Sequence, residues 1–388
     1  ACLVRAGAPE MSSGWNWRHR YLVGLSMVDV ESIGAGGGSI AGVEAGALRV
    51  GPQSAGSEPG PICYGRGGTQ PTVTDADLVL GYLDPGSFRG TSLPLRREGV
   101  DEAILRAVGR PLELSLEEAA HGIFRLANAS MADAIRRVSA RRGVDLRDLV
   151  LVAYGGSAPI HAPMQAEELG LHEILVPRAA PVLSALGLLL ADPLTDELRS
   201  YIAPAKQIAL ERINALFDEM EAKAADALAR EGTVPREIDR FAQLRYPGQP
   251  FELTVPVAAR NGRISAAEIE ATIERFHEIH REIHGDALRD EEPILQGLRM
   301  RAVGLSRKPE LPRVPRARGP ASAARKEKRR AYFDGGYAAV PVYDGSALRA
   351  GHKIKGPAIV EEPFTTVVVH PGHRAEIDAW GNYRIALG

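Results

Sequence analysis

The sequence predicts an α/β protein in which part of the sheet is parallel. Two observations support this prediction. Between residues 115 and 176, two helical segments alternate with two apolar runs of strand length, and a pair of glycines follows the first run. That order is typical of a parallel sheet covered by helices. Because open α/β sheets bind ligands at the carboxyl ends of their strands, the glycine turn also marks a candidate site.

The N-terminal part, to about residue 90, is rich in glycine, proline and short apolar runs, which is typical of strands joined by turns and long loops. Within it, Gly34 and three consecutive glycines at 36–38 follow the strand-like segment 28–30. Glycines lack Cβ atoms, so consecutive N–H groups can approach a bulky anion. The turn therefore has two interpretations, a phosphate-binding loop or a glycine-rich turn without a ligand.

The segment that follows contains a candidate carboxylate. The loop at 51–61 has too many glycines and prolines for a helix or a central strand, and long loops are often functional. After it, residues 72–81 predict a turn, a Thr or Asp cap, and a short helix that ends at glycine. Asp75 is a candidate site residue, although helix capping alone explains it.

The longest helix is predicted to begin at Ser115, which has capping-box spacing to Glu118, and to end at Gly143. Its apolar residues recur every three or four positions, so one face is expected to be buried. The apolar run 149–153 then predicts a buried strand and the glycines at 155 and 156 a turn. Residues 161–169 predict a second helix, and 173–176 a second strand.

Beyond residue 192 the pattern changes to an α+β region. Helical patterning at 208–230, a strand-like segment at 245–255 and a helix with a capping box at 265–268 succeed one another. The segment 313–330 has eight Lys or Arg and one Glu among Pro and Gly, which predicts a solvated basic linker. Short strands at 340–343, 358–361 and 365–370 follow. We therefore predict domains at 1–203 and 204–388, the second ending in a β-rich module at 331–388.

Composition excludes several classes of partner and predicts a compartment. The net charge is −2, so no overall field attracts nucleic acid or an anionic membrane, and the basic linker has no aromatic residue for base stacking. Two cysteines form no disulfide framework, which predicts a reducing, cytoplasmic location. The longest apolar run, 179–191, is shorter than the roughly 20 residues that cross a bilayer.

Few motifs indicate a specific chemistry. The spacing of His277, His280 and His284 suits a metal, but apolar residues alternate with them, and surface histidines are common. The serine-hydrolase, zinc-protease and P-loop motifs are absent from the sequence. Two glycine turns remain, each after a predicted strand, one suited to phosphate and the other to a base or ribose.

A series of motifs in this order resembles the hydantoinase A/oxoprolinase family. The motifs are IGAGGGSIA at 33–41, GPQSAG at 51–56, PGP at 59–61, CYGRGG at 63–68, PTVTDA at 71–76, Gly155-Gly156, SALG at 184–187, Arg245-Tyr246 with Gly248-Gln249, and GPAI at 356–359. They extend almost to the C-terminus, and their agreement in order is more specific than either glycine turn.

The resemblance implies an actin-like or sugar-kinase-like ATPase fold, with ATP and Mg²⁺ in a cleft between two subdomains. By match to the motifs, the residues expected against phosphate are Gly34, Gly36, Gly37, Gly38 and Ser39, and those expected near adenosine are Gly155, Gly156 and Ser157. Asp29 ends the strand before the turn and is a candidate contact for a Mg²⁺-bound or attacking water. A buried or capping aspartate is the alternative, and no metal ligands are identified.

The resemblance also implies a subunit of an ATP-dependent enzyme. Family members couple ATP cleavage to the opening of cyclic amides such as hydantoins and oxoproline, through phosphorylation of the carbonyl. An ATP-using subunit of a carboxylase that acts on a ketone is the alternative, and a non-catalytic binding or assembly subunit is a third interpretation. A hydantoinase B-type partner is expected. Because the family's N-terminal subdomain and first phosphate loop have no match here, we expect a C-terminal portion of a longer polypeptide that is inactive alone.

Overall fold

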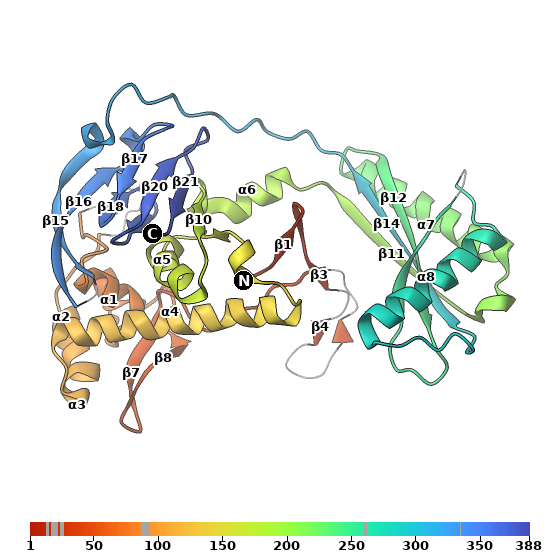
Figure 1. The fold of residues 1–388 in the computed structure, drawn as a ribbon, viewed down its shortest axis with the longest axis horizontal. Helices are drawn as coiled ribbons and strands as arrows, with labels where there is room; N and C mark the ends of the chain where they lie inside the picture. The colour runs from red at the N-terminus through yellow and green to blue at the C-terminus, as the bar shows by residue number, and fades with distance from the viewer. Residues whose placement is uncertain (13–14, 17–21, 24–26, 87–93, 260–261, 334) are drawn as a thin grey trace. The chain divides into compact units, whose positions relative to one another are not determined.

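The computed structural model (Figure 1) describes residues 1–388 except 13–14, 17–21, 24–26, 87–93, 260–261 and 334. The chain forms two compact units, the first made of Ala1–Leu186 and Glu310–Gly388 and the second of Gly187–Pro309. The sequence-based division at 203/204 places residues 204–388 in one domain. In the structure, residues 310–388 pack instead with the N-terminal part of the chain. Helices and sheets occur in both units, which confirms the predicted mixed α/β class.

The first unit contains most of the helices. They are α1 (Val73–Val79), α2 (Val100–Ile104), α3 (Arg110–Leu112), α4 (Leu116–Arg141), α5 (Ala158–Leu169) and α6 (Leu183–Leu190), whose end passes into the second unit. The N-terminal strands form hairpin-like pairs, β1 (Val4–Arg5) with β2 (Ala8–Pro9), β3 (Met11–Ser12) with β6 (Met27–Val28), β4 (Trp15–Asn16) with β5 (Leu22–Val23), and β7 (Ser39–Glu44) with β8 (Ala47–Ser54).

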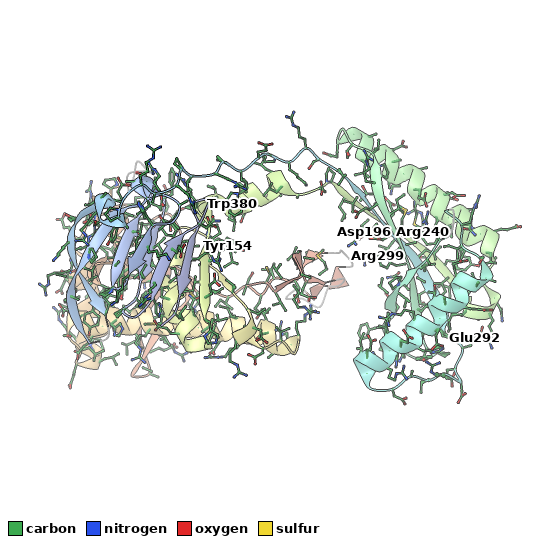
Figure 2. All side chains as sticks on the ribbon, turned by 45° about the horizontal axis from the view of Figure 1, so that its top comes forward. Tyr154, Asp196, Arg240, Glu292, Arg299 and Trp380 are labelled. Carbon is green, nitrogen blue, oxygen red and sulfur yellow. The ribbon has the colours of Figure 1, made fainter. Side chains whose placement is uncertain are left out.

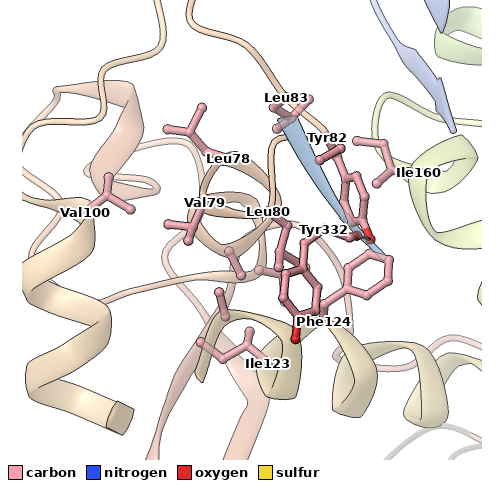
Figure 3. Close-up of a cluster of buried hydrophobic side chains, with 14 of the residues drawn as sticks. Leu78, Val79, Leu80, Tyr82, Leu83, Val100, Ile123, Phe124, Ile160 and Tyr332 are labelled. Carbon is pink, nitrogen blue, oxygen red and sulfur yellow. Dashed lines mark hydrogen bonds between the residues drawn. The ribbon is translucent and has the colours of Figure 1, made fainter. Parts of the chain in front are cut away.

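The helix predicted from Ser115 is α4, and it organises one hydrophobic core. Ser115 Oγ accepts a hydrogen bond from Glu118 N, and the Glu118 carboxylate accepts one from Ser115 N, so the predicted capping box is confirmed. On its buried face Phe124 packs in a cluster with residues of α1 and the C-terminal part of the chain (Figure 3). Tyr82 donates a 2.6 Å hydrogen bond to Tyr332 O, which ties these distant segments together.

A five-stranded sheet carries the second predicted glycine turn. Its order is β17 (Lys353–Lys355), β20 (Arg374–Ile377), β21 (Tyr383–Ala386), β10 (Glu173–Val176) and β9 (Leu151–Val152). β9 and β10 are parallel, with Leu151 opposite Ile174, which confirms the predicted parallel pair. The prediction of a buried strand over 149–153 is wrong, because β9 is two residues long at the sheet edge and Val150 and Val152 are exposed. α5 connects these two strands and packs against β10. The glycine turn therefore lies at the carboxyl end of a parallel strand, as expected for a ligand-binding position.

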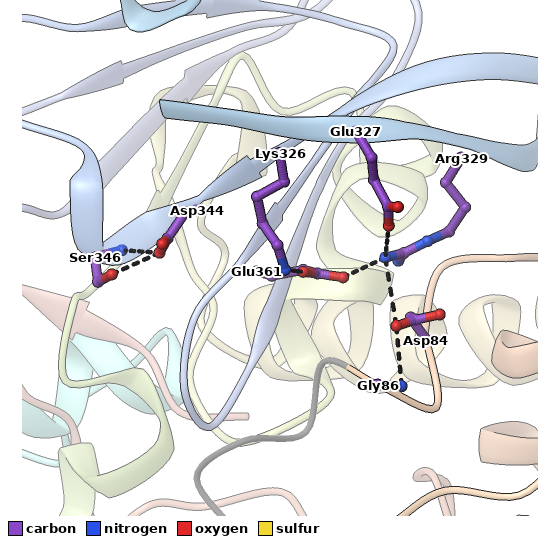
Figure 4. A network of polar contacts seen from close by, with 8 residues as sticks. All are labelled: Asp84, Gly86, Lys326, Glu327, Arg329, Asp344, Ser346 and Glu361. Atoms are coloured by element: carbon purple, nitrogen blue, oxygen red, sulfur yellow. Dashed lines mark hydrogen bonds and ion pairs between the residues drawn. The ribbon is translucent and has the colours of Figure 1, made fainter. Parts of the chain in front are cut away.

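The assignment of residues 313–330 to a linker is wrong for its last part. The segment 325–330 belongs to β15 (Arg325–Phe333), which forms a sheet in the order β15, β16 (Gly336–Asp344), β18 (Ala358–Glu361) and β19 (Thr366–Val369). Lys326 and Arg329 both contact Glu361, whose side chain is 5% exposed (Figure 4). These cations have a partner 35 and 32 residues further along the chain, which local composition does not reveal.

We expect Glu361→Gln to destabilise this sheet. The Arg329 side chain is 12% exposed, so loss of the carboxylate leaves a nearly buried cation whose remaining contacts within the described residues are the longer ones to Glu327 and Asp84. Breaking a buried pair costs about 3–5 kcal/mol, and the remaining contacts place the expected cost at the lower end. Hydrogen exchange of the β15 and β18 amides measures it. The control is Glu327→Gln, at a side chain 57% exposed, and equal protection in both variants would contradict this account.

The same ion pairs predict a loss of stability in acid. Burial raises the pKa of Glu361, but hydrogen bonds from Lys326 and Arg329 outweigh it and hold the pKa below the usual 4.5. Because the folded-state pKa is the lower one, this stabilisation is present above the unfolded-state pKa and is lost as the pH falls through the folded-state pKa. The protection of the β18 amides from hydrogen exchange, corrected for intrinsic exchange rates, should decrease in the wild type as the pH is lowered below 4.5. In Glu361→Gln the same protection should not change over this pH range.

The second unit is an antiparallel sheet with two helices packed on one face. The sheet order is β11 (Leu194–Pro204), β14 (Ile294–Gly304), β12 (Pro235–Arg245) and β13 (Leu253–Val257), and the helices are α7 (Leu210–Arg230) and α8 (Ala266–His284). Met300 and Ala302 of β14 are buried in one cluster with both helices. Arg299, at an alternate position, pairs with Asp196 of β11 (Figure 2). No helix in the described ranges is long and apolar enough to cross a membrane.

Candidate functional site

The structure brings the two predicted glycine turns together. A Cβ atom built on Gly37 would lie 3.6 Å from Ser157 Oγ and 2.6 Å from Thr74 Oγ1. Gly37 therefore lies between the N-terminal ends of α1 and α5, where a side chain has no room. Ser157 is the N-cap residue of α5, and its side chain makes no capping hydrogen bond. The residues expected near phosphate and near adenosine thus line one place in the first unit.

In the turn at 36–38 the carbonyl groups accept hydrogen bonds, whereas two of the N–H groups have no protein acceptor among the described residues. The carbonyl oxygens of Gly36, Gly37 and Gly38 accept backbone hydrogen bonds of 2.9–3.0 Å from Ser39, Thr74 and Ala55. Thr74 Oγ1 donates a second bond, of 2.9 Å, to Gly37 O. Within the described part of the chain, the Gly37 and Gly38 amides donate to no protein acceptor. Two adjacent free N–H groups on a fixed turn are donors suited to an anion.

Ser39 closes this turn from inside. Its side chain is buried, and its Oγ accepts a 2.9 Å hydrogen bond from Gly36 N and lies 3.4 Å from Gly34 O. A Cβ on Gly34 would lie 2.8 Å from Pro52 Cβ, so the end of β8 packs directly on the turn. These contacts give Ser39 and Gly34 a role in shaping the turn, and their contact with phosphate stays a prediction.

Asp75 is the N3 residue of a capping box on α1, and its side chain is fully buried. One carboxylate oxygen accepts hydrogen bonds from Thr72 N and Thr72 Oγ1, both at 2.9 Å, and from Ile62 N at 3.2 Å. The other accepts from Cys63 N at 2.8 Å. Four donors from two segments explain this carboxylate as a helix cap and a loop clamp, one of the two interpretations of the sequence.

The second turn is held from both sides. Gly155 has φ +108°, a conformation that favours glycine, and its N–H donates a 2.7 Å hydrogen bond to Ala180 O. Thr365 Oγ1 donates a 2.7 Å hydrogen bond to Gly156 O, so the loop between β18 and β19 supports the turn. A Cβ on Gly155 would meet nothing within 4 Å, which leaves space beside the turn.

Asp29 lies in an ion pair away from the contacts described above. Its carboxylate pairs with Arg142, the C-cap residue of α4, and its side chain is 38% exposed. Neighbouring Glu31 pairs with Arg137 and Arg141 of the same helix. The segment after β6 is thus attached to the end of α4 by charge. A contact between Asp29 and a metal-bound or attacking water stays a prediction.

Comparisons with known proteins identify the family. A family model described as hydantoinase/oxoprolinase matches residues 1–197, and a model of the hydantoinase/oxoprolinase C-terminal domain matches residues 203–385. The chain belongs to the hydantoinase/oxoprolinase family. The resemblance inferred from the motifs is therefore confirmed, over nearly the whole chain.

Several members of the hydantoinase/oxoprolinase family resemble this chain closely. It is 35% identical over 377 residues to the caprolactamase subunit alpha of Pseudomonas jessenii, covering 95% of this chain and 54% of that one. It is 34% identical over 383 residues to the acetophenone carboxylase gamma subunit of Aromatoleum aromaticum, covering 93% and 51%. The crystal structure of the ATP-dependent caprolactamase from P. jessenii matches with a TM-score of 0.80, covering 97% and 55%. The chain spans about half the length of these relatives.

Two of the three histidines that have metal-like spacing, His277 and His280, make structural hydrogen bonds in this family member. His277 and His280 are buried, not at the surface. The Tyr246 hydroxyl lies 2.5 Å from His277 Nδ1, and Gln249 Nε2 lies 2.7 Å from His280 Nε2. Among the described residues, no group of three or more His, Cys, Asp or Glu side chains is placed to hold a metal ion. The alternation of histidine and apolar residues in α8 therefore marks a buried helix face on which His277 and His280 have hydrogen-bond partners.

Two further features of the hydantoinase/oxoprolinase chain are not candidates for its chemistry. Burial, and then the adjacent Asp75 carboxylate, raise the pKa of the Cys63 thiol, so it stays protonated and is a poor nucleophile. A cavity of about 920 Å³ lies beside β9, and its lining is mostly apolar, with Ser139, Tyr154, Gln165 and Ser184 as its polar side chains. A mostly apolar lining suits a phosphate group less well than the N–H groups of the turn at 36–38 do.

Sequence reasoning missed the residues that hold each turn in place. Thr74 holds Gly37 O, and Thr365 holds Gly156 O, although each is distant from its partner in sequence. Thr74 had one local signal, because it lies next to the capping Asp75 at the start of a helix. Thr365 has no local signal in the sequence, because the pairing of β18 with β19 is what brings it next to Gly156.

Proposed function

We propose that this chain is the ATP-binding part of an enzyme that opens a cyclic amide through phosphorylation of its carbonyl oxygen. The observation that carries the proposal is the pair of N–H groups of Gly37 and Gly38, which are free among the described residues, with Gly37 beside Ser157 at the N-terminal end of α5. Free amides and the positive end of a helix dipole both favour a phosphate group. The relative in the matching structure is named an ATP-dependent caprolactamase, and caprolactam is a cyclic amide.

In the proposed reaction, the amides of Gly37 and Gly38 hold phosphate oxygens of ATP and stabilise the charge on the transferred group. Transfer of the γ-phosphoryl group to the lactam oxygen makes the carbonyl carbon a better electrophile. Water then adds to this carbon, the ring C–N bond breaks, and the leaving nitrogen takes a proton from the added water, which gives an amine and an acyl phosphate. A second water hydrolyses the acyl phosphate to a carboxylate and inorganic phosphate. The turn at 155–157 holds the adenosine, because it lies beside Gly37 and has open space next to Gly155.

The family implies Mg²⁺, which neutralises phosphate charge when it is bound. Mg²⁺ usually keeps several waters and takes only one or two carboxylates beside substrate phosphates. We propose Asp29 as the contact from this chain, which requires it to exchange its ion pair with Arg142 for a metal-bound water.

The activity is best tested on the complete enzyme with its partner subunit, for which we propose a hydantoinase B-type chain. ADP release is measured with a set of lactams and hydantoins, and separately with bicarbonate plus a ketone. Stimulation by a cyclic amide supports the proposal. The carboxylase alternative rests on the 34% identity to the acetophenone carboxylase gamma subunit, and stimulation only by bicarbonate and ketone would favour it. No ATP binding at all would indicate an assembly subunit instead.

A further inference from the structure

A buried acid and a buried histidine join α1 to α5 directly below the meeting point of the two turns. Asp77 of α1 and His161 of α5 have exposed fractions of 0% and 1%, and His161 Nε2 lies 3.4 Å from Asp77 Oδ2. Asp77 follows Thr74 by three residues, and His161 follows Ser157 by four. Residues at these spacings share one face of a helix. Each helix therefore contributes one side chain at Gly37 and a second one a turn deeper.

The network around His161 determines which ring nitrogen carries the proton. Asn128 Nδ2 donates a 2.9 Å hydrogen bond to Phe124 O, which sets the orientation of the amide group. The same Nδ2 lies 3.2 Å from His161 Nδ1, and Asn128 Oδ1 accepts from Gln165 Nε2. A donor facing Nδ1 requires that Nδ1 be an acceptor. The proton of a neutral His161 therefore sits on Nε2, which lies 3.4 Å from Asp77 Oδ2.

Asp77 has little else to stabilise it. Within the described residues, neither of its carboxylate oxygens accepts a hydrogen bond of ordinary geometry, and both are buried. The His161 ring also stacks on Phe124 of α4, at 4.9 Å between centroids. Both α1 and α5 pack on α4, so the pair lies where three helices meet. A buried carboxylate with so few partners costs stability, so its position calls for an explanation other than stability.

We propose that Asp77 and His161 form a positioning pair for the nucleotide. The contact between His161 Nε2 and Asp77 sets the separation of α1 and α5, and with it the distance between the phosphate turn at Gly37 and the adenosine turn at Ser157. A nucleotide that spans both turns binds only when this distance is right. Asp77 and His161 do not contact the nucleotide themselves in this proposal. This inference rests on the proposed function, since it requires ATP at the two turns.

The test compares variants of the complete enzyme. His161→Leu removes the donor to Asp77 at similar volume, and we expect it to raise the KM for ATP by about 10-fold or more. His161→Gln places an amide N–H near the former Nε2 and is expected to restore the KM to within about threefold. The KM for the lactam should stay unchanged in both variants. The control is His280→Leu, a buried histidine of the second unit with two hydrogen bonds, which should lower stability without raising the KM for ATP.

Each outcome decides a different point. An unchanged KM for ATP in folded His161→Leu overturns the positioning role and leaves the proposed function intact. A His161→Gln variant as impaired as His161→Leu also overturns it, because the contact with Asp77 would then not be what matters. A wild-type enzyme that binds no ATP overturns the proposed function itself. If His161→Leu does not fold, Asp77→Asn keeps the protein testable: it retains an oxygen that can accept from Nε2, and a KM for ATP within about threefold of the wild type supports a hydrogen bond over a charge.

Discussion

Replacing Gly37 by valine in the complete enzyme is expected to lower kcat/KM for ATP by about 100-fold or more. The first atom of the new side chain would lie 2.6 Å from Thr74 Oγ1, so the two hydrogen bonds from Thr74 to Gly37 O must open and the turn must move. The free amides of Gly37 and Gly38 then leave the positions in which they meet phosphate. Two charge-assisted hydrogen bonds at about 1.5–3 kcal/mol each account for an effect of this size.

The matched control for this variant is Gly42→Val on β7. A Cβ on Gly42 meets nothing within 4 Å, and valine suits a strand, so ATP kinetics should change by less than about threefold. Steady-state ATP hydrolysis with saturating lactam measures both variants, after their unfolding temperatures show that they are folded. A folded Gly37→Val enzyme with wild-type kcat/KM for ATP would show that the turn does not hold the nucleotide.

Asp75→Ala is expected to cost about 3–5 kcal/mol of local stability, the largest effect of any single substitution in α1. It leaves four buried donors, from Ile62, Cys63 and Thr72, without an acceptor. Asp75→Asn should be nearly as damaging. Its one oxygen can serve Cys63, but its NH₂ group would then face the donors of Thr72 and Ile62.

Hydrogen exchange of the amides in α1 and at 62–64 measures the effect of both Asp75 variants. The control is Asp101→Ala, which breaks an exposed ion pair with Arg97 and should cost about 1 kcal/mol or less. Because α1 carries Thr74, which holds Gly37, the Asp75 variants should also weaken ATP binding. Asp75→Ala with the protection of the wild type would contradict the clamp.

The elements that the sequence predicts well are those with a strong local pattern. The capping box at Ser115 and the apolar period of α4 depend on neighbouring residues, and the structure confirms both. The apolar run before the glycines forms a parallel strand as predicted, but only over two residues and without the predicted burial. What sequence reasoning misses depends on distant partners. Arg329 looks like part of a solvated linker until β18 brings Glu361 beside it. His277 looks exposed until Tyr246, 31 residues away, is placed next to its ring.

The candidate site shows the same limit. Glycines at 36–38 and 155–156 mark the two turns in the sequence, since few other residues fit such places. That Ser157 meets Gly37, and that Asp77 meets His161 beneath them, follows from how α1 and α5 pack on α4. No local spacing encodes those approaches.

A structure of the complete enzyme with a non-hydrolysable ATP analogue tests the account most directly. We predict phosphate oxygens within hydrogen-bonding distance of Gly37 N and Gly38 N, with the adenosine beside Gly155 and Gly156. Phosphates bound elsewhere, with the amides of Gly37 and Gly38 still free, would contradict it.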